Sequence, residues 1–202
     1  MLEPLFTPRS VLLTGISPEP GNLARTSLYN LRTAGYAGEI HLLGRKEADV
    51  FGIPIRTSFD DLPDGIDVAV VLTPARMVAD TLDQCGRKGI RYAIVQSAGF
   101  AELGEEGARL ADEVLAVARR HQIRFSGPNG LGVINPACGF DPVFIPMRPQ
   151  WRPGGASVAT QSGGMGLSYL WAFGDQNVGV ARWVSMGNKL DLDEVDYVRF
   201  LS

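Results

Sequence analysis

The fold is decided by the stretch SVLLTGISPEPGNLARTSL, which runs from Ser10 to Leu28. Its first residues form a continuous apolar run, typical of a strand covered on both faces, and its last residues have helical spacing. Between the two lie residues that permit tight turns and helix caps, namely Gly15, Ser17, Gly21 and Asn22. We therefore predict a strand, a turn and a helix, with a positive φ at Gly21 or Asn22 before the helix begins.

The predicted turn has the chemistry of an anion site. Backbone N–H groups at the start of a helix lack acceptors within the helix, and the helix dipole adds partial positive charge there. A phosphate group binds well at such a corner. The strict G-x-G-x-x-G spacing is absent, so a capped turn without a ligand is an equally good interpretation of these residues alone.

Short apolar runs recur after this stretch, and segments with helical spacing separate them. The runs predict buried strands at Val11–Thr14, Ile40–Leu43, Asp67–Leu72, Tyr92–Gln96 and Ile123–Phe125. The segments between them predict helices at Leu23–Ala34, Ala75–Lys88 and Gly107–His121. This alternation predicts an α/β fold with a Rossmann-like, doubly wound and mostly parallel sheet.

The pattern changes near residue 135. Residues 135–155 hold five prolines and no amphipathic period, which predicts an extended crossing. After it we expect a strand, a helix at Gly164–Asp175, a strand at Val180–Ser185 and a helix at Asp193–Leu201. We divide the chain into residues 1–146 and 147–202, and interpret the second part as a βαβα half-domain. A unit of that size rarely encloses a core alone, so we expect either a truncated domain or packing on the first part or on another copy.

Composition narrows the class of protein. The chain has 202 residues and a formal charge of −3, which gives no basic field for a nucleic acid. Its two cysteines show no paired spacing, which favours a reducing compartment. No leader pattern and no apolar run long enough to span a bilayer is seen. We expect a cytoplasmic protein that binds neither nucleic acid nor membrane.

The end of the second predicted strand is positively charged. In NAD-binding proteins of this fold an acidic residue at this point binds the ribose hydroxyls. Here Arg45 and Lys46 take its place. Cations favour a phosphorylated ribose, which NADP and coenzyme A both carry. Two solvated loop charges are the other interpretation of the pair.

Small and turn-forming residues follow other predicted strands, in the sequences VLTPA, QSAGF and SGPNGLGVINP. Ligands of open α/β sheets bind beyond the carboxyl ends of the strands, so these turns predict a groove for an extended ligand. The segment QSGG, Gln161 to Gly164, also follows a strand and opens a helix. It predicts a second anion site, although Ser162 as a simple helix cap explains it too.

These motifs, in this order, resemble the NDP-forming acyl-CoA synthetases, the superfamily that includes succinyl-CoA synthetase α subunits, and above all its ADP-forming acetyl-CoA synthetase branch. The resemblance is carried by PRSVLLTGIS, PGN, GYAGEI, DLPDGIDVAVVLTPA, CGRKGIRYAIVQSAGFAE, GPNGLGVINP, TQSGGMG and VSMGNKLDLDEVD. Together they extend over nearly the whole chain. The resemblance implies a CoA-binding domain followed by a partial flavodoxin-like ligase domain.

The resemblance also implies binding residues. The first turn and the lysine after the second strand would hold the nucleotide phosphates of coenzyme A, and the later strand ends would hold the rest of it. The residues implied in coenzyme A binding are Gly15, Ser17, Lys46, Thr73, Pro74, Ser97, Ala98, Gly99, Pro128 and Asn129. Those implied at the reactive phosphate are Gln161, Ser162 and Gly163. Neither a catalytic residue nor a metal ligand is predicted in this chain.

Family members convert a carboxylic acid, coenzyme A and a nucleoside triphosphate into acyl-CoA, nucleoside diphosphate and phosphate, through an acyl phosphate and a phosphohistidine. This chain holds only His41 and His121, and we interpret both as structural. It also has Gly130 where the family commonly has cysteine, and only Lys46 remains of the usual VNPK. We therefore expect an incomplete ligase whose partners are coenzyme A or acyl-CoA, a small carboxylic acid, and a further ligase or ATP-grasp domain or subunit; a homo-oligomer is compatible with this.

Other functions stay open at this point. A non-catalytic CoA or acyl-CoA sensing module, as in protein lysine acetyltransferases with a degenerate synthetase region, carries similar motifs. An NADP-dependent reductase also fits Arg45 and Lys46, but the sequence shows no catalytic Tyr–Lys or Cys–His arrangement for it. We rank the reductase last.

Overall fold

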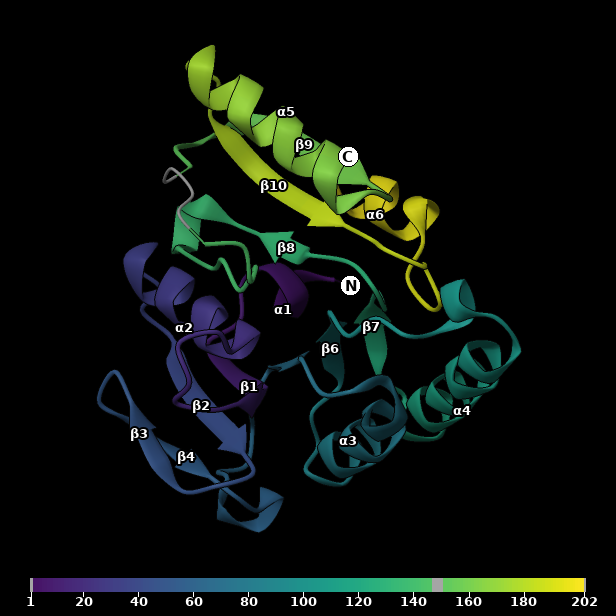
Figure 1. Ribbon diagram of the computed structural model, residues 1–202. Coiled ribbons are helices and arrows are strands. Elements are labelled where there is room, and N and C mark those ends of the chain that lie inside the picture. The colour runs from purple at the N-terminus through teal and green to yellow at the C-terminus, as the bar shows by residue number, and fades with distance from the viewer. Residues whose placement is uncertain (1, 147–150, 202) are drawn as a thin grey trace.

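Figure 1 shows a computed structural model of the protein, which describes residues 2–146 and 151–201. The strands are β1 Ser10–Ile16, β2 Glu39–Gly44, β3 Ala48–Val50, β4 Ile53–Arg56, β5 Val68–Val71, β6 Tyr92–Val95, β7 Arg124–Ser126, β8 Gly132–Ile134, β9 Pro153–Thr160 and β10 Val180–Ser185. The helices are α1 Glu3–Phe6, α2 Leu23–Thr33, α3 Ala75–Arg87, α4 Glu105–His121, α5 Gly163–Asp175 and α6 Glu194–Leu201. Short 3₁₀ turns occur at Phe59–Asp61, Ala101–Leu103 and Pro136–Cys138.

The strands form two sheets. The larger has seven strands in the order β3-β4-β2-β1-β5-β6-β7, and every pair in it is parallel except β3 with β4. The smaller has the order β8-β10-β9, in which β9 runs parallel and β8 antiparallel to β10. The predicted α/β fold with a mostly parallel sheet is confirmed.

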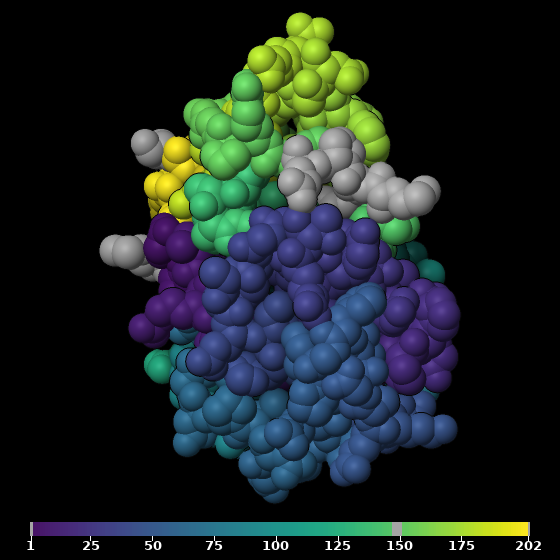
Figure 2. Space-filling model, turned by 90° about the vertical axis from the view of Figure 1, so that its left-hand side faces the viewer, coloured from purple at the N-terminus to yellow at the C-terminus, as the bar shows by residue number. Residues whose placement is uncertain are grey.

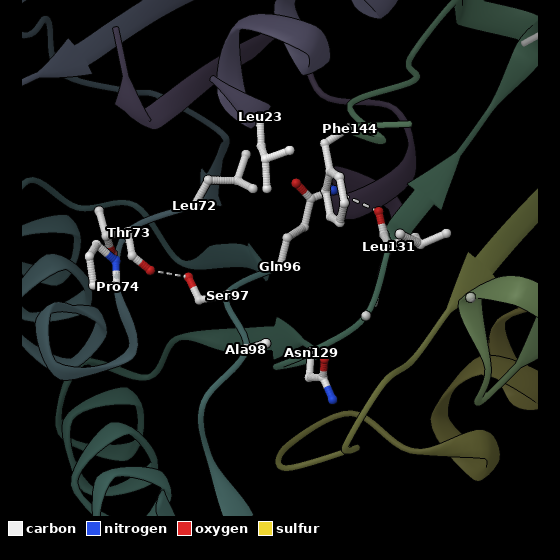
Figure 3. A pocket seen from close by; sticks show the side chains of 12 residues that line it. Leu23, Leu72, Thr73, Pro74, Gln96, Ser97, Ala98, Asn129, Leu131 and Phe144 are labelled. Atoms are coloured by element: carbon white, nitrogen blue, oxygen red, sulfur yellow. Dashed lines mark hydrogen bonds between the residues drawn. The ribbon is translucent and has the colours of Figure 1, made fainter. Parts of the chain in front are cut away.

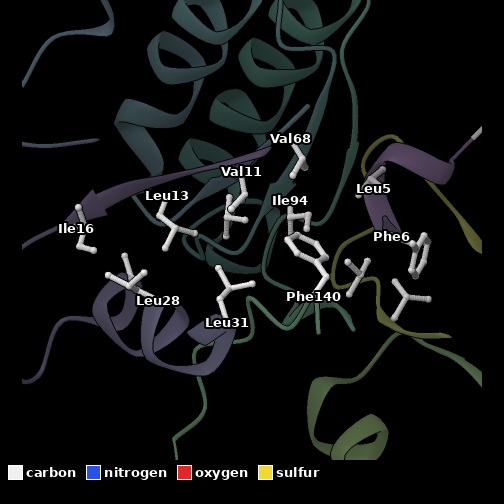
Figure 4. Packing of buried hydrophobic residues seen from close by; sticks show 14 of the residues in the cluster. Leu5, Phe6, Val11, Leu13, Ile16, Leu28, Leu31, Val68, Ile94 and Phe140 are labelled. Atoms are coloured by element: carbon white, nitrogen blue, oxygen red, sulfur yellow. The ribbon is translucent and has the colours of Figure 1, made fainter. Parts of the chain in front are cut away.

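Helices cover both faces of the large sheet, which explains why its strands are apolar without alternation. Val11 and Leu13 of β1 pack in the cluster that contains Leu28 and Leu31 of α2 (Figure 4). Leu12, between them, belongs to the opposite cluster, which α3 and α4 cover with Val78, Leu82 and Val114 among others. The sheet is therefore wound on both faces, as predicted.

The smaller sheet has its own apolar cluster. Trp183 of β10 lies at its centre, fully buried, and its indole N–H donates to the carbonyl of Gly166 in α5 at 2.9 Å. Ile134 of β8 belongs to the same cluster, so a strand inside the range 1–146 completes the second sheet. The predicted start of the second part at residue 147 lies outside the described residues. Figure 2 shows residues of this part in green and yellow-green at the narrow end of the molecule.

The second part packs on the first through its last helix. Tyr197 of α6 is fully buried in the cluster of the large sheet and meets the ring of Phe6 edge to face, with centroids 6.2 Å apart. Phe200 stacks on the same ring at 5.1 Å. Of the arrangements expected for the second part, the structure therefore shows packing on the first.

Some expectations are wrong. The residue with positive φ in the first turn is Gly15, at +75°, whereas Asn22 has φ of −72° and caps α2. Residues 135–155 are not simply an extended crossing, because they contain a 3₁₀ turn and the start of β9, and Phe140 is fully buried. The sequence pattern also missed α1, β3, β4 and β8, which are short elements of three or four residues.

No helix in residues 2–146 and 151–201 is long and apolar enough to span a bilayer. Within the same ranges no cluster of histidine, cysteine, aspartate and glutamate has the makings of a metal site.

Candidate functional site

A pocket of about 430 Å³ lies at the carboxyl ends of strands β5 and β6 (Figure 3). It is bounded by turns that follow the strands and by the first residues of α2 and α5. Its walls are formed by Leu23, Leu72, Thr73, Pro74, Gln96, Ser97, Ala98, Asn129, Gly130, Leu131, Phe144 and Gly163. The pocket therefore occupies the sheet edge at which open α/β folds bind their ligands.

The predicted residues divide into those that line this pocket and those that do not. Residues from both predicted groups meet there, namely Thr73, Pro74, Ser97, Ala98 and Asn129 from the first and Gly163 from the second. The pocket-lining set does not include Gly15, Ser17, Lys46, Gly99, Pro128, Gln161 and Ser162. Sequence reasoning did not single out Leu23, Leu72, Gln96, Leu131 and Phe144 as binding residues. Of these only Gln96 gave a signal, as a polar residue at the end of an apolar run.

Ser97 joins the ends of neighbouring strands. Its Oγ lies 2.6 Å from the carbonyl oxygen of Thr73 and 3.3 Å from that of Val71. Its own carbonyl accepts a hydrogen bond from the N–H of Asn129 at 2.8 Å. The hydroxyl proton of Ser97 is thus used within the protein, and this residue holds the turns after β5, β6 and β7 together.

Gln96 is buried beside it, with 4% of its surface exposed. Its Nε2 donates to the carbonyls of Leu131, at 2.6 Å, and Pro142, at 3.1 Å. Its Oε1 is buried and has no hydrogen-bond partner in the described residues, and the same holds for Oγ1 of Thr73. Buried polar atoms are usually paired, so two unpaired ones in a single pocket point to a polar ligand.

The turn after β6 is closed by a carboxylate. Glu102 Oε1 accepts from the N–H groups of Gly99, at 2.7 Å, and Phe100, at 3.1 Å, and its Oε2 accepts from Asn188 Nδ2 at 2.6 Å. Partial burial alone would raise the pKa of Glu102, but these hydrogen bonds together lower it below its ordinary value. Because Glu102 takes the N–H of Gly99, this N–H faces a side chain of the protein and not the pocket.

The first turn lies outside the pocket and stabilises negative charge by itself. Asn22 caps α2, since its Oδ1 accepts from the N–H of Arg25 and its Nδ2 donates to the carbonyl of Gly15, both at 2.9 Å. The pKa of Glu19 is lowered, chiefly by a hydrogen bond from the Ser17 side chain, then by its own backbone N–H and by nearby Lys46. The carboxylate of Glu19 therefore lies in surroundings that favour a negative charge.

The start of α5 is held by its own caps. Ser162 accepts from the N–H of Met165 at 3.3 Å, as the cap interpretation predicts. Gln161 Nε2 donates to the carbonyl of Gly187 at 3.1 Å, and the N–H of Gly187 donates back to the Gln161 carbonyl at 3.1 Å. A Cβ on Gly163 would lie 2.7 Å from Cγ of Leu131, so glycine lets this helix begin directly at the pocket wall.

Neither histidine lines the pocket. His41 lies inside β2, and His121 ends α4, where its Nε2 is 2.7 Å from Oδ1 of Asp83 in α3. Both positions agree with a structural interpretation, because one side chain sits within the sheet and the other joins two helices.

Residues 9–136, which carry all but two of the pocket-lining residues, match the family described as CoA binding domain. The chain belongs to the CoA binding domain family. Outside this CoA binding domain, residues 153–202 match the succinyl-CoA ligase like flavodoxin domain. The match supports coenzyme A as the bound cofactor or substrate, as predicted from the sequence.

Two relatives of this chain are acetate–CoA ligases. Acetate–CoA ligase [ADP-forming] I of Archaeoglobus fulgidus is 35% identical over 201 residues, which cover 100% of this chain and 29% of that protein. The α subunit of acetate–CoA ligase [ADP-forming] I of Pyrococcus furiosus is 34% identical over 203 residues, covering 98% of this chain and 44% of the subunit. The predicted resemblance to this superfamily is confirmed, and neither relative supports the acetyltransferase-like alternative.

A solved structure shows the same arrangement. The apo form of the dinucleotide forming acetyl-coenzyme A synthetase 1 of Ca. Korarchaeum cryptofilum matches with a TM-score of 0.92 at 30% identity, over 100% of this chain and 43% of that one. The CoA binding domain chain thus spans less than half the length of these relatives.

Proposed function

We propose that this chain is the CoA-binding part of an ADP-forming acid–CoA ligase, which converts a carboxylic acid, coenzyme A and ATP into acyl-CoA, ADP and phosphate. One observation carries the proposal. The pocket joins the strand ends of the CoA binding domain, such as Thr73 and Ser97, to Gly163 at the first turn of α5, within the flavodoxin-domain match. A cofactor site and a helix N-terminus suited to phosphate therefore share one pocket.

The nucleotide end of coenzyme A is assigned to the first turn. Ser17 and Lys46 already surround the carboxylate of Glu19, and a phosphate would take its place. Gly15 and the start of α2 add backbone groups and the positive end of a helix dipole. We assign Lys46 to the 3′-phosphate on the ribose of coenzyme A, because its exposed ammonium binds as a point charge.

The pantetheine end is assigned to the pocket. Its walls are mostly apolar, with Leu23, Leu72 and Phe144 facing one another (Figure 3). The unpaired polar atoms on Gln96 and Thr73 fit a chain that carries amide groups. This is the pattern expected of cofactor sites, in which apolar walls hold the ligand and a few polar atoms orient it.

The reacting end is assigned to the start of α5. There the helix N-terminus beside Gly163 would stabilise the phosphate of an acyl phosphate, while Pro128 and Asn129 bring the thiol end near. Sulfur attacks the acyl carbon, the bond from that carbon to the phosphate oxygen breaks, and phosphate leaves, taking up the proton that the thiol gives up. The chain's own contribution is to place the two reactants and to balance the charge of the leaving phosphate.

The phosphoryl-transfer residue is assigned to another part of the enzyme, because neither histidine lines the pocket. We propose a further ligase or ATP-grasp domain or subunit as the partner, and a homo-oligomer as the second arrangement to test. The surface of α5 supports a partner, since Met165 is 54% exposed and Trp171 48%. We retain residues 1–146 and 147–202 as the two domains, and a small carboxylic acid as the second substrate.

Ligand-dependent melting tests the proposal. Coenzyme A and acetyl-CoA should raise the melting temperature of the chain, whereas NAD and NADP should leave it unchanged. A ligand that binds the folded state stabilises it by RT ln(1 + [L]/Kd), where [L] is the free ligand concentration. The chain alone should show no formation of acyl-CoA from acid, coenzyme A and ATP. Stabilisation by NADP but not by coenzyme A would refute the assignment, and turnover by the chain alone would refute the division of roles.

A further inference from the structure

The amide of Gln96 has only one orientation that its surroundings permit. Its Nε2 lies between two carbonyl oxygens, those of Leu131 and Pro142, and donates to both. The opposite orientation would place Oε1 against these two acceptors. Oε1 therefore points away from them, into the space between Leu23 and Phe144 in Figure 3.

This oxygen is an acceptor without a donor. Gln96 has 4% of its surface exposed, and no described residue donates to Oε1. The side chains nearest to it in the pocket wall, Leu23 and Phe144, have no donor to offer. Leaving a buried acceptor unpaired is costly, so a ligand that supplies a donor there gains affinity over one that does not.

We infer that Gln96 is a specificity-determining residue, whose Oε1 accepts a hydrogen bond from a neutral N–H or O–H group of the bound ligand. This inference rests on the proposed function, because it concerns the part of the cofactor or acyl group that fills the pocket. A carboxylate or phosphate oxygen at this point would face another acceptor, and a cation would lose its hydration against apolar walls. The Oγ1 of Thr73, a second unpaired atom of a pocket-lining residue, can donate to a carbonyl of the same ligand.

Two parts of an acyl-CoA carry such a donor. The pantetheine arm has two amide N–H groups and one hydroxyl, and an acyl group with a hydroxyl has a further O–H. Both sources would supply one neutral hydrogen-bond donor to a pocket with mostly apolar walls. A secondary amide both donates and accepts, so it suits a pocket that offers an acceptor on Gln96 and a donor on Thr73.

The test removes the donor from the ligand and so leaves the fold untouched. Coenzyme A is compared, by titration calorimetry on the full 202-residue chain, with two analogues in which one or the other amide N–H is replaced by an ester oxygen and with a third that lacks the hydroxyl of the arm. We expect one of the three to bind about tenfold more weakly, since it no longer offers a donor to Oε1 of Gln96. Glycolyl-CoA is compared with acetyl-CoA in the same way, to test the hydroxyl of the acyl group as the source.

A Gln96→Met variant completes the cycle, because it keeps the length of the side chain and removes the acceptor. In this variant, the ligand with the donor and the ligand without it should differ in affinity by less than about twofold. Binding of adenosine 3′,5′-bisphosphate, which lacks the pantetheine arm, serves as the check that the variant is folded. If the effect of removing an amide N–H, the hydroxyl of the arm or the glycolyl hydroxyl depends on Gln96, this supports the inference and identifies the source. If coenzyme A binds the native chain but none of these groups couples to Gln96, the inference is wrong; if coenzyme A does not bind at all, the proposed function itself fails.

Discussion

Replacing Gly15 by alanine tests how the first turn is built. Gly15 has a φ of +75°, a conformation that residues with a Cβ rarely adopt. A Cβ at this position would lie 2.5 Å from the carbonyl oxygen of Leu72 and 2.9 Å from its carbon. Both are backbone atoms of the pocket wall, so no side-chain rotation relieves the contact.

The two effects can be added. A left-handed conformation costs a non-glycine residue about 1–2 kcal/mol, and forcing an extra methyl into packed surroundings costs about 1–3 kcal/mol. We therefore expect Gly15→Ala to lower the free energy of unfolding by about 2–5 kcal/mol. Because Leu72 and Thr73 must shift, we also expect coenzyme A to bind at least about tenfold more weakly.

Two other glycines, Gly35 and Gly21, separate the conformational cost from the cost of the steric contact. Gly35 has a φ of +78° but nothing within 4 Å of its added Cβ, so Gly35→Ala should cost only the conformational part, about 1–2 kcal/mol. Gly21 has neither a positive φ nor a neighbour within 4 Å, so Gly21→Ala should change the stability by less than about 1 kcal/mol.

Urea unfolding followed by circular dichroism measures all three variants against the native chain, with the slope m as the check that unfolding stays comparable. The order of destabilisation should be Gly15→Ala, then Gly35→Ala, then Gly21→Ala. If Gly15→Ala unfolds no more easily than Gly35→Ala, the contact with the backbone of Leu72 does not restrain the first turn, and the argument for its rigidity is wrong.

Other residues give shorter tests. Lys46→Glu should weaken coenzyme A binding more than dephospho-CoA binding in calorimetry, because the proposed contact is to the phosphate that only coenzyme A carries; equal losses exclude that contact. Hydrogen bonding to His121 lowers the pKa of Asp83, with Arg87 adding to it, so this cluster should stabilise the native chain above the ordinary carboxyl pKa of 3.8 and stop doing so as the pH falls through the lower native value. Melting curves against pH should therefore fall less steeply in acid for Asp83→Asn, and identical profiles contradict the cluster's role. Burial raises the pKa of Cys85 to about 12, so a thiol reagent at pH 8 should label it only after denaturation.

The central strands could be predicted because burial on both faces leaves a clear mark in the sequence. Leu12 faces α3 and α4 while Val11 and Leu13 face α2, so three consecutive apolar residues were required. The elements that were missed lack such a mark. The strands β3 and β4 form a short hairpin at the sheet edge, and β8 gains its partner only when β10, far along the chain, lies beside it.

The pocket was predictable to the extent that it follows strand ends. Thr73, Ser97 and Asn129 each lie in the turn that follows a strand of the large sheet, and a parallel sheet brings such positions to one edge. Phe144 reaches the same pocket from an irregular segment, where no periodicity shows which way a side chain points. The role of Glu102 was also hidden, since its partner Asn188 lies 86 residues further along the chain and meets it only in the folded protein.

The pocket belongs to both parts of the chain together, and backbone hydrogen bonds show why. The N–H groups of Asn188, Leu190 and Leu192 donate to carbonyls of residues 128, 127 and 125, at 2.8, 3.0 and 3.2 Å. The segment after β10 thus runs along the end of β7 and fixes the turn that carries Asn129. Asn188 adds side-chain bonds to Glu102 and Asn129, which hold the turns after β6 and β7 in one position. Since these bonds set where the pocket wall lies, the second part shapes the proposed cofactor site even where its own side chains do not reach it.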